Sequence, residues 1–122
     1  MRLFKCLICG NLVELINDGG GTLVCCGQEM EEQMVNPNET VFEKHIPVIT
    51  KEGKKVKVQV GSTIHPMTEE HYIEWITLVD EKGSCKKVLS PNDQPTAEFE
   101  TDSEHFTVYA YCNIHGFYKA EY

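Results

Sequence analysis

The chain has 122 residues, of which 41% are hydrophobic and 25% charged, and its formal net charge is −8. This length is enough to bury one modest core beside a small module. The acidic charge repels nucleic acid and anionic membranes, so neither is expected as a partner, and an anionic substrate would need a local positive group. No apolar run approaches the roughly 20 residues of a membrane span, and residues 1–5 lack the apolar core of a secretory signal. We therefore expect a soluble, cytoplasmic protein.

The six cysteines favour metal binding over disulfides. Without an export signal the chain is expected in the reducing cytosol, where thiols serve as metal ligands or redox groups. Residues 1–34 hold four of the cysteines and a glycine run at 19–21, with too few large apolar side chains for a core of their own. A metal is therefore expected to hold this segment. The polar stretch 35–39 predicts a boundary between a domain of residues 1–35 and one of residues 36–122.

Two cysteine pairs in the first domain have the spacing of a four-thiolate metal site. Cys6 and Cys9 lie on a tight turn followed by Gly10, and Cys25 and Cys26 are adjacent. Four soft sulfur ligands suit tetrahedral iron or zinc, and the spacing does not choose between them, so a structural zinc stays open. Adjacent side chains of a strand point to opposite faces, so the second pair can reach one ion only if the backbone bends sharply, and we expect a distorted tetrahedron. A thioredoxin-type dithiol at Cys6 and Cys9 would lack its expected strand and helix and would leave the second pair unexplained.

Period-two alternation of apolar and polar residues dominates the second domain. It recurs at residues 55–60, 72–79 and 106–111, which predicts a strand in each range. No window shows a helical stripe, so the predicted fold class is all-β, with an antiparallel sandwich of about seven short strands. Turn-prone sequences separate the strands at residues 52–53, 80–83 and 90–93.

All five histidines lie in the second domain, and four of them fall in short motifs at predicted strand ends and loops. The last motif also supplies a cysteine. Loops cluster at the ends of a sandwich, so residues distant in sequence can converge on one ion there while the sheets fix their geometry. Independent surface imidazoles are the alternative for any single histidine, but four in such motifs beside a cysteine favour one metal site. The motifs are Glu43-Lys44-His45, His65-Pro66-Met67 with Glu70-His71, and Cys112-Asn113-Ile114-His115-Gly116.

These motifs together resemble those of desulfoferrodoxin, the two-iron form of superoxide reductase. The match extends over essentially the whole chain. It implies a rubredoxin-like or desulforedoxin-like Fe(Cys)4 domain, an immunoglobulin-like sandwich with a second mononuclear iron of type Fe(His)4Cys, and a homodimer paired partly through the small domains. The first iron would be held by Cys6, Cys9, Cys25 and Cys26. The second would have an equatorial plane of His45, His65, His71 and His115 and the axial thiolate of Cys112.

The implied ligand set suits one-electron reduction of superoxide to hydrogen peroxide. Four neutral imidazoles and one thiolate leave a ferrous site positive, with the position opposite the sulfur open to an anion. Lys44 would attract superoxide to that position and orient a proton-donating water, and Glu43 would ligate the ferric iron. A reductase also needs an external electron donor, for which the resemblance implies a rubredoxin-type protein.

Other functions stay open from the sequence: a non-catalytic iron protein that only transfers electrons, a superoxide dismutase, and a zinc-stabilised binding module. An open coordination position argues against the first of these. A thiolate-ligated site favours only the reductive half of a dismutase reaction. Metal content and colour would separate the third from an iron enzyme.

Several other residues are expected to lie outside the metal sites, and some of these to have structural roles. His105 and Cys85 lie outside the motifs and are expected to be a surface histidine and a plain thiol. Trp75 lies in an alternating strand, where core packing is expected. Asn113 and Gly116 are expected to shape the turn of the last motif.

Overall fold

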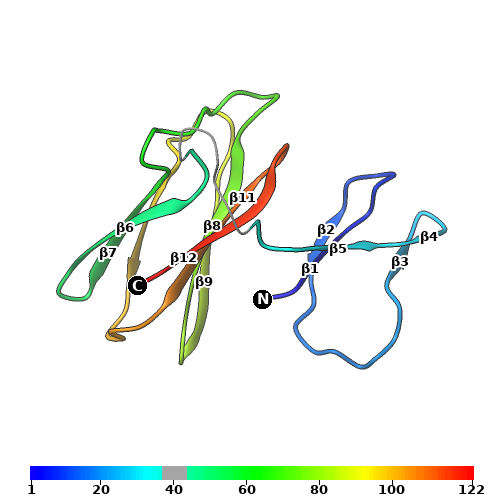
Figure 1. Cartoon of the computed structure of the whole chain (residues 1–122), viewed down its shortest axis with the longest axis horizontal. Helices are drawn as coiled ribbons and strands as arrows, with labels where there is room; N and C mark the ends of the chain where they lie inside the picture. The colour runs from blue at the N-terminus through cyan, green and yellow to red at the C-terminus, as the bar shows by residue number, and fades with distance from the viewer. Residues whose placement is uncertain (37–43) are drawn as a thin grey trace. The chain divides into compact units, whose positions relative to one another are not determined.

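The computed structural model describes residues 1–36 and 44–122. Within these ranges the chain forms two compact units, Met1–Met34 and Val35–Tyr122, and every regular element is a β-strand (Figure 1). The described part of the chain contains no helix of the length and apolarity that crossing a bilayer requires. The prediction of an all-β chain is confirmed.

The first unit consists of short strands and turns around a very small core. Three strands form an antiparallel sheet in the order β2-β1-β5, and two others form a ribbon. Among the described residues of this unit, the buried apolar side chains are Leu3 and Cys6. Such burial is less than a free-standing fold of this size needs, which agrees with a requirement for metal. The strands are β1 (Leu3–Lys5), β2 (Leu12–Glu14), β3 (Val24–Cys25), β4 (Gln28–Glu29) and β5 (Glu31–Gln33).

The second unit is a sandwich of two antiparallel sheets with seven strands among its described residues. One sheet has the order β10-β7-β6 and the other the order β12-β11-β8-β9, as Figure 1 shows. The predicted sandwich of about seven strands is confirmed. The strands are β6 (Pro47–Glu52), β7 (Lys55–Val60), β8 (Ile73–Asp80), β9 (Gly83–Val88), β10 (Thr96–Glu100), β11 (Thr107–Cys112) and β12 (Gly116–Glu121).

Alternation along the strands supplies the core between the sheets. In β7 the side chains of Val56, Val58 and Val60 are buried, whereas Lys55 and Lys57 on the other face are exposed. The predicted strand at 55–60 is β7, and those predicted at 72–79 and 106–111 lie one residue further along as β8 and β11. Strand β9 is exposed along its whole length, so it carries no apolar alternation that a sequence pattern detects. The opposite sheet contributes Ile73, Ile76, Leu78, Val108 and Ala110 to the core.

One end of the sandwich gathers the segments that carry the histidine motifs. Pro47 at the start of β6 pairs with Val60 at the end of β7, and Cys112 pairs with both Ile73 and Gly116. The start of β6, the β7–β8 connection and the β11–β12 turn therefore lie at the same end (Figure 1). A register shift just before Cys112 marks a β-bulge, and the Cys112 side chain is fully buried there.

Candidate metal centres

Four cysteine sulfurs lie together in the first unit. The Sγ atoms of Cys6, Cys9, Cys25 and Cys26 are all within 4.8 Å of one another. The backbone of Cys26 has a φ of 53°, in the left-handed region that residues other than glycine rarely adopt. This is the sharp bend that lets two adjacent cysteines face one point, as the sequence predicted.

The separation of these sulfurs fits a single tetrahedral ion. Metal–sulfur bonds of about 2.3 Å at tetrahedral angles place neighbouring sulfurs about 3.8 Å apart, and the Sγ atoms of Cys9 and Cys25 are 3.6 Å apart. Without a cation the thiols of Cys6 and Cys26 differ strongly in acidity. The Cys9 N–H donates a hydrogen bond that lowers the pKa of Cys6 to about 6, whereas hydrogen bonds with the thiols of Cys9 and Cys6 raise the pKa of Cys26 to about 12. A bound cation would favour the thiolate form of all four.

The second cluster lies at the motif-bearing end of the sandwich. The ligand atoms of His45, His65, His71 and Cys112 are all within 4.8 Å of one another. His45 lies two residues before the start of β6, His65 and His71 come from the β7–β8 connection, and Cys112 ends β11. Three separate parts of the chain therefore meet at one point, and each is fixed to a strand of the same sandwich.

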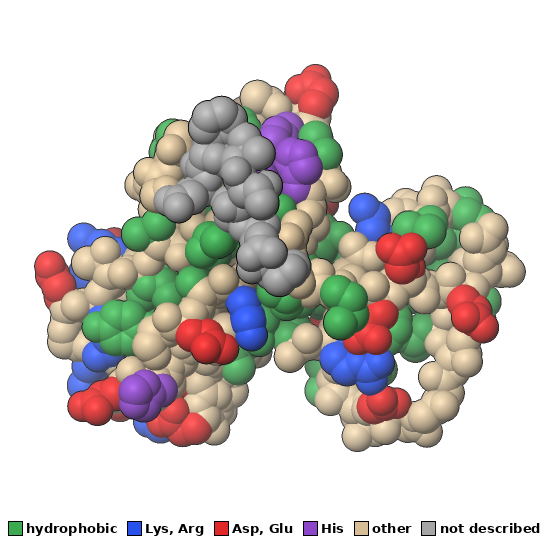
Figure 2. Space-filling view, in the orientation of Figure 1, with side chains coloured by type: hydrophobic (Ala, Val, Ile, Leu, Met, Phe, Trp, Pro, Cys, Tyr) green, Lys and Arg blue, Asp and Glu red, His purple; other side chains and the backbone are tan. Residues whose placement is uncertain are grey.

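His115, in the β11–β12 turn, completes a ring of imidazoles. Its Nδ1 lies 3.0 Å from the Nε2 of His45 and 3.8 Å from the Sγ of Cys112. The ring centroids follow the order His45, His65, His71, His115, with successive separations of 4.7, 4.6 and 4.9 Å and a closing separation of 4.8 Å. The diagonal from His45 to His71 is longer, at 6.2 Å, so the four rings form a near-square. Figure 2 shows histidine atoms reaching the surface at this end of the sandwich, and His115 is exposed.

The nitrogen atoms of this ring fit a metal ion better than they fit one another. The Nε2 atoms of His65 and His71 are buried and have no hydrogen-bond partner. A buried polar atom without a partner is costly, and a metal ion would satisfy both. Two nitrogens at right angles around one ion, each about 2.1 Å from it as in zinc–imidazole bonds, are about 3.0 Å apart. The separation of 3.0 Å between His45 and His115 matches that geometry.

The surroundings of His65 and His71 favour neutral imidazoles, which is the form that binds metal. Burial, and after it the charges of His45, His71 and His115, lower the pKa of His65 to about 4. The Nδ1–H of His65 donates to the carbonyl oxygen of Pro66 at 2.7 Å, which leaves the lone pair on Nε2 facing the cluster. Burial is also the main reason that the pKa of His71 is lowered.

Two contacts fix members of the cluster in place, and neither was predicted from the sequence. The N–H of His115 lies 3.5 Å from the Sγ of Cys112 and donates to it, which stabilises a thiolate there. The ring of Tyr118 stacks on His45 with centroids 4.6 Å apart and planes inclined by 15°. The Nδ2 of Asn36 donates to the Tyr118 Oη at 3.1 Å. Tyr118 lies in β12 next to Phe117, which is also buried, so no alternation of buried and exposed residues marked it in the sequence.

Lys44 and Glu43 precede the first histidine of the ring. Lys44 is half-buried, and its positive charge contributes to the lowered pKa of His71, so the charge acts on the cluster. Glu43 lies outside the described residues. Of the residues left out of the predicted site, His105 and Cys85 are exposed, and Trp75 is buried against Tyr111 with ring centroids 5.7 Å apart.

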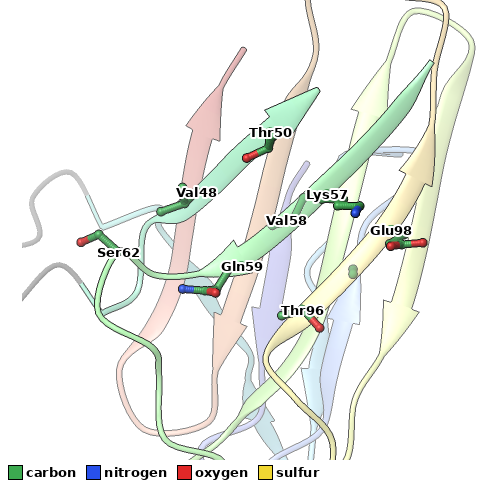
Figure 3. A pocket seen from close by; sticks show the side chains of 9 residues that line it. Val48, Thr50, Lys57, Val58, Gln59, Ser62, Thr96 and Glu98 are labelled. Atoms are coloured by element: carbon green, nitrogen blue, oxygen red, sulfur yellow. The ribbon is translucent and has the colours of Figure 1, made fainter. Parts of the chain in front are cut away.

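A separate hollow lies on the outer face of the β10-β7-β6 sheet, where Figure 3 shows its lining side chains. Its volume is about 590 Å³, and cross-strand neighbours such as Thr50, Lys57 and Glu98 line it. Among the described residues that line it there is neither a histidine nor a cysteine. The metal chemistry of the described chain is therefore concentrated in the two clusters.

A cysteine-held unit followed by a sandwich with a histidine–thiolate cluster defines the chain as a non-haem metalloprotein with two mononuclear centres. Comparison with known proteins identifies the metal and the family. The family described as "Desulfoferrodoxin" matches residues 37–121, and the one described as "Desulfoferrodoxin, N-terminal domain" matches residues 1–32. The chain belongs to the desulfoferrodoxin family. It is an oxidoreductase with two mononuclear iron sites, of type Fe(Cys)4 and Fe(His)4Cys.

Individual relatives match over nearly the whole chain. A desulfoferrodoxin homolog of Archaeoglobus fulgidus is 49% identical over 120 residues, which cover 98% of this chain and 96% of the relative. The desulfoferrodoxin of Nitratidesulfovibrio vulgaris is 48% identical and covers 98% of this chain and 95% of its own. The crystal structure of the superoxide reductase from Treponema pallidum superposes with a TM-score of 0.77 at 31% identity, covering 98% of this chain and 95% of that one.

A shorter solved relative matches only part of the chain. The superoxide reductase of Giardia intestinalis, designated 1Fe-SOR, superposes with a TM-score of 0.57 at 28% identity and covers 66% of this chain and 97% of its own. Residues 35–122 are long enough to supply that match by themselves. The family resemblance predicted from the motifs is confirmed.

Proposed function

We propose that the chain is a superoxide reductase that converts superoxide to hydrogen peroxide at the histidine–thiolate centre. The observation that carries the proposal is the near-square of four imidazoles with one cysteine sulfur beside it, held by separate segments of one sandwich. Superoxide gains one electron and two protons in this reaction, and its oxygen–oxygen bond stays intact. When bound, the ferrous ion supplies the electron.

The ligand assignments follow from the two clusters. Neutral imidazoles add no charge to a ferrous ion, and a single thiolate lowers its charge by one, so the centre stays positive and attracts an anion. The lowered pKa values of His65 and His71 support neutral imidazoles, and the N–H donated by His115 supports a thiolate at Cys112. We assign His45, His65, His71, His115 and Cys112 to this centre and Cys6, Cys9, Cys25 and Cys26 to the other.

Lys44 supplies the local positive charge that an acidic protein needs in order to attract an anionic substrate. The chain carries a net charge of −8, which repels superoxide at long range. The ammonium of Lys44 acts on the cluster, as its effect on the pKa of His71 indicates, and it can orient a water that donates a proton. We assign Lys44 to substrate attraction and protonation.

The Lys44→Ala variant should react with superoxide roughly tenfold more slowly at low ionic strength, because it loses electrostatic attraction at the centre. Its rate should also respond less to added salt. The exposed Lys57→Ala on the outer face of β7 is the matched control and should keep the parent rate. Stopped-flow mixing over a range of salt concentrations measures both effects. An unchanged rate in Lys44→Ala would remove this residue from the mechanism.

Glu43 is proposed as a further ligand of the ferric ion, because a hard carboxylate prefers ferric to ferrous iron. The residue lies outside the described part of the chain, so the proposal rests on the motif in which it precedes Lys44 and His45. Glu43→Ala should change the absorption spectrum of the ferric protein and its response to pH. An identical spectrum and pH response would contradict the assignment.

The product balance tests the proposed reaction directly. Ferrous protein mixed with superoxide should form hydrogen peroxide in an amount equal to the superoxide consumed, without evolving oxygen. Evolution of oxygen without an external reductant would instead indicate a dismutase. If the iron is oxidised by superoxide no faster than by other one-electron oxidants, the protein is an electron carrier. His71→Ala should lose the activity, whereas the exposed His105→Ala should keep it.

The proposal also assigns a role to each domain, an electron donor and an oligomeric state. Residues 1–35 are proposed as the Fe(Cys)4 domain and residues 36–122 as the reductase domain. A rubredoxin-type protein is the proposed electron donor, and the protein is proposed to be a cytoplasmic homodimer. The one-iron relative supports placing the reaction in the second domain. Sedimentation equilibrium tests the dimer, and electron transfer from reduced rubredoxin to the ferric protein tests the donor.

A further inference from the structure

The side chain of Asn113 reaches out of its own turn to a different part of the site. Its Oδ1 accepts a hydrogen bond from the Tyr72 N–H at 3.0 Å, and its Nδ2 donates to the Glu70 carbonyl oxygen at 3.0 Å. The backbone N–H of Asn113 also donates to the Tyr72 carbonyl oxygen at 3.2 Å. Three hydrogen bonds therefore join the residue after Cys112 to the residues on either side of His71.

These bonds replace strand pairing where the sheet becomes irregular. Strands β8 and β11 pair up to Ile73 and Cys112, and the register shifts just before Cys112. Beyond that point the side-chain amide of Asn113 offers one acceptor and one donor, as a peptide group does. The amide thus continues the hydrogen-bond pairing of β8 and β11 into the segment that carries His71, which lies outside the strand.

The backbone of His71 itself is hydrogen-bonded to Thr68. The N–H of Thr68 donates to the carbonyl oxygen of His71 at 2.9 Å, and the N–H of His71 donates to the Oγ1 of Thr68 at 3.1 Å. The backbone of His71 is thus held within its own turn by Thr68, and that turn is held to the cysteine turn by Asn113. With the two side-chain links of Asn113 removed, the turn keeps its shape, and of the three hydrogen bonds only the backbone bond from the Asn113 N–H to Tyr72 still joins it to the cysteine turn.

We propose that Asn113 is a positioning residue that fixes His71 relative to Cys112 and so sets how firmly the second centre holds its iron. The proposal rests on the assignment of His71 and Cys112 to one ion made above. It also goes beyond the expectation that Asn113 shapes the turn of the last motif. Its effect should be confined to this centre, because the Fe(Cys)4 centre lies in the other compact unit.

The first test uses metal-free protein and therefore does not depend on any reaction. In amide hydrogen exchange, the Tyr72 N–H should lose protection in Asn113→Ala, because its acceptor is gone. Asn113→Asp keeps an oxygen acceptor for that N–H and loses the donor to Glu70, so Tyr72 should stay protected. Asn92→Ala, an exposed asparagine in the same unit, is the matched control and should resemble the parent.

The second test measures iron release to a chelator from the loaded protein, with the Fe(Cys)4 centre of the same molecule as internal reference. Asn113→Ala should release iron from the histidine–thiolate centre about tenfold faster, which corresponds to about 1.4 kcal/mol and is of the order of the two lost side-chain hydrogen bonds. Asn113→Asp should also release it faster than the parent, while release from the Fe(Cys)4 centre stays unchanged in both.

Parental Tyr72 exchange in Asn113→Ala would show that the hydrogen bond does not hold this segment and would overturn the proposal. Altered exchange with parental iron release would leave Asn113 a purely structural residue and would overturn it equally. Neither readout requires superoxide, so failure of the proposed reaction and failure of this proposal are distinguishable.

Discussion

Acidification of the metal-free protein should destabilise the sandwich through His65. Burial and the neighbouring imidazoles lower the pKa of this residue from 6.5 to about 4 in the folded state. In the unfolded chain the imidazole is in water and keeps its ordinary value. The unfolded state therefore binds the proton first as the pH falls. Stability from this residue is complete above pH 6.5 and is lost as the pH falls from 6.5 toward 4.

The size of the loss follows from the shift. Each pKa unit corresponds to about 1.4 kcal/mol, so the shift of His65 amounts to about 3 kcal/mol, and to about 2 to 3 kcal/mol once water entering the metal-free cluster is allowed for. That is a large part of the free energy of unfolding of a small domain, which is about 5–15 kcal/mol. Only 2% of the His65 side chain is exposed, so the charged form has little water to stabilise it.

Urea unfolding of metal-free protein at a series of pH values measures this effect, with the fluorescence of Trp75, the single tryptophan, as the probe. Carboxylates titrate in the same range, so the comparison is with His65→Leu, in which the loss between pH 6.5 and 4 should be smaller by about 2 to 3 kcal/mol. His105→Leu, which changes an exposed histidine, should keep the parental dependence. Equal dependence in His65→Leu, or titration of His65 near pH 6.5 in NMR spectra, would refute the reasoning.

Three further outcomes are expected. Phe99→Ala removes a core side chain that is 5% exposed and should lower the free energy of unfolding by about 3–5 kcal/mol in urea titrations, whereas Val88→Ala, at a position 73% exposed, should change it little. Thr101→Val removes the hydroxyl that donates to Asp80 at 2.6 Å and lowers the pKa of that carboxyl. Stability from a lowered carboxyl pKa is present at neutral pH and lost in acid, so the acid-unfolding midpoint should move to higher pH, and an unmoved midpoint would contradict this. Cys26→Ser should abolish the absorption of the Fe(Cys)4 centre and leave that of the histidine–thiolate centre intact, and loss of both would contradict the independence of the two centres.

The strands were predictable where one face of the strand is buried. Residues 55–60 alternate because Val56, Val58 and Val60 face the core, and the pattern gives both the strand and its limits. The exposed strand β9 carries no such pattern because none of its residues is buried, and its place as the edge strand beside β8 follows from pairing alone.

In the candidate site, too, some residues were predictable from the sequence and others were not. The motifs pointed to His45, His65, His71 and His115, because a histidine near another ligand in a short motif is unusual without a metal. The motifs did not indicate Tyr118, whose ring stacks on His45 from β12.

By itself the sequence determined the chemistry available to this protein: soft thiolates in one segment, imidazoles and one thiolate in another, an acidic surface, and strands that form a sandwich. These follow from residue types and short-range periodicity, which are local properties of a chain. Only the tertiary structure decided that the four imidazoles form a near-square, that Cys112 faces it, and that Asn113 joins the two turns. These relations depend on strand pairing and on the bulge before Cys112, which bring together groups far apart in the sequence. Glu70 and Asn113, for example, are 43 residues apart. No local sequence pattern encodes which distant residues will come into contact.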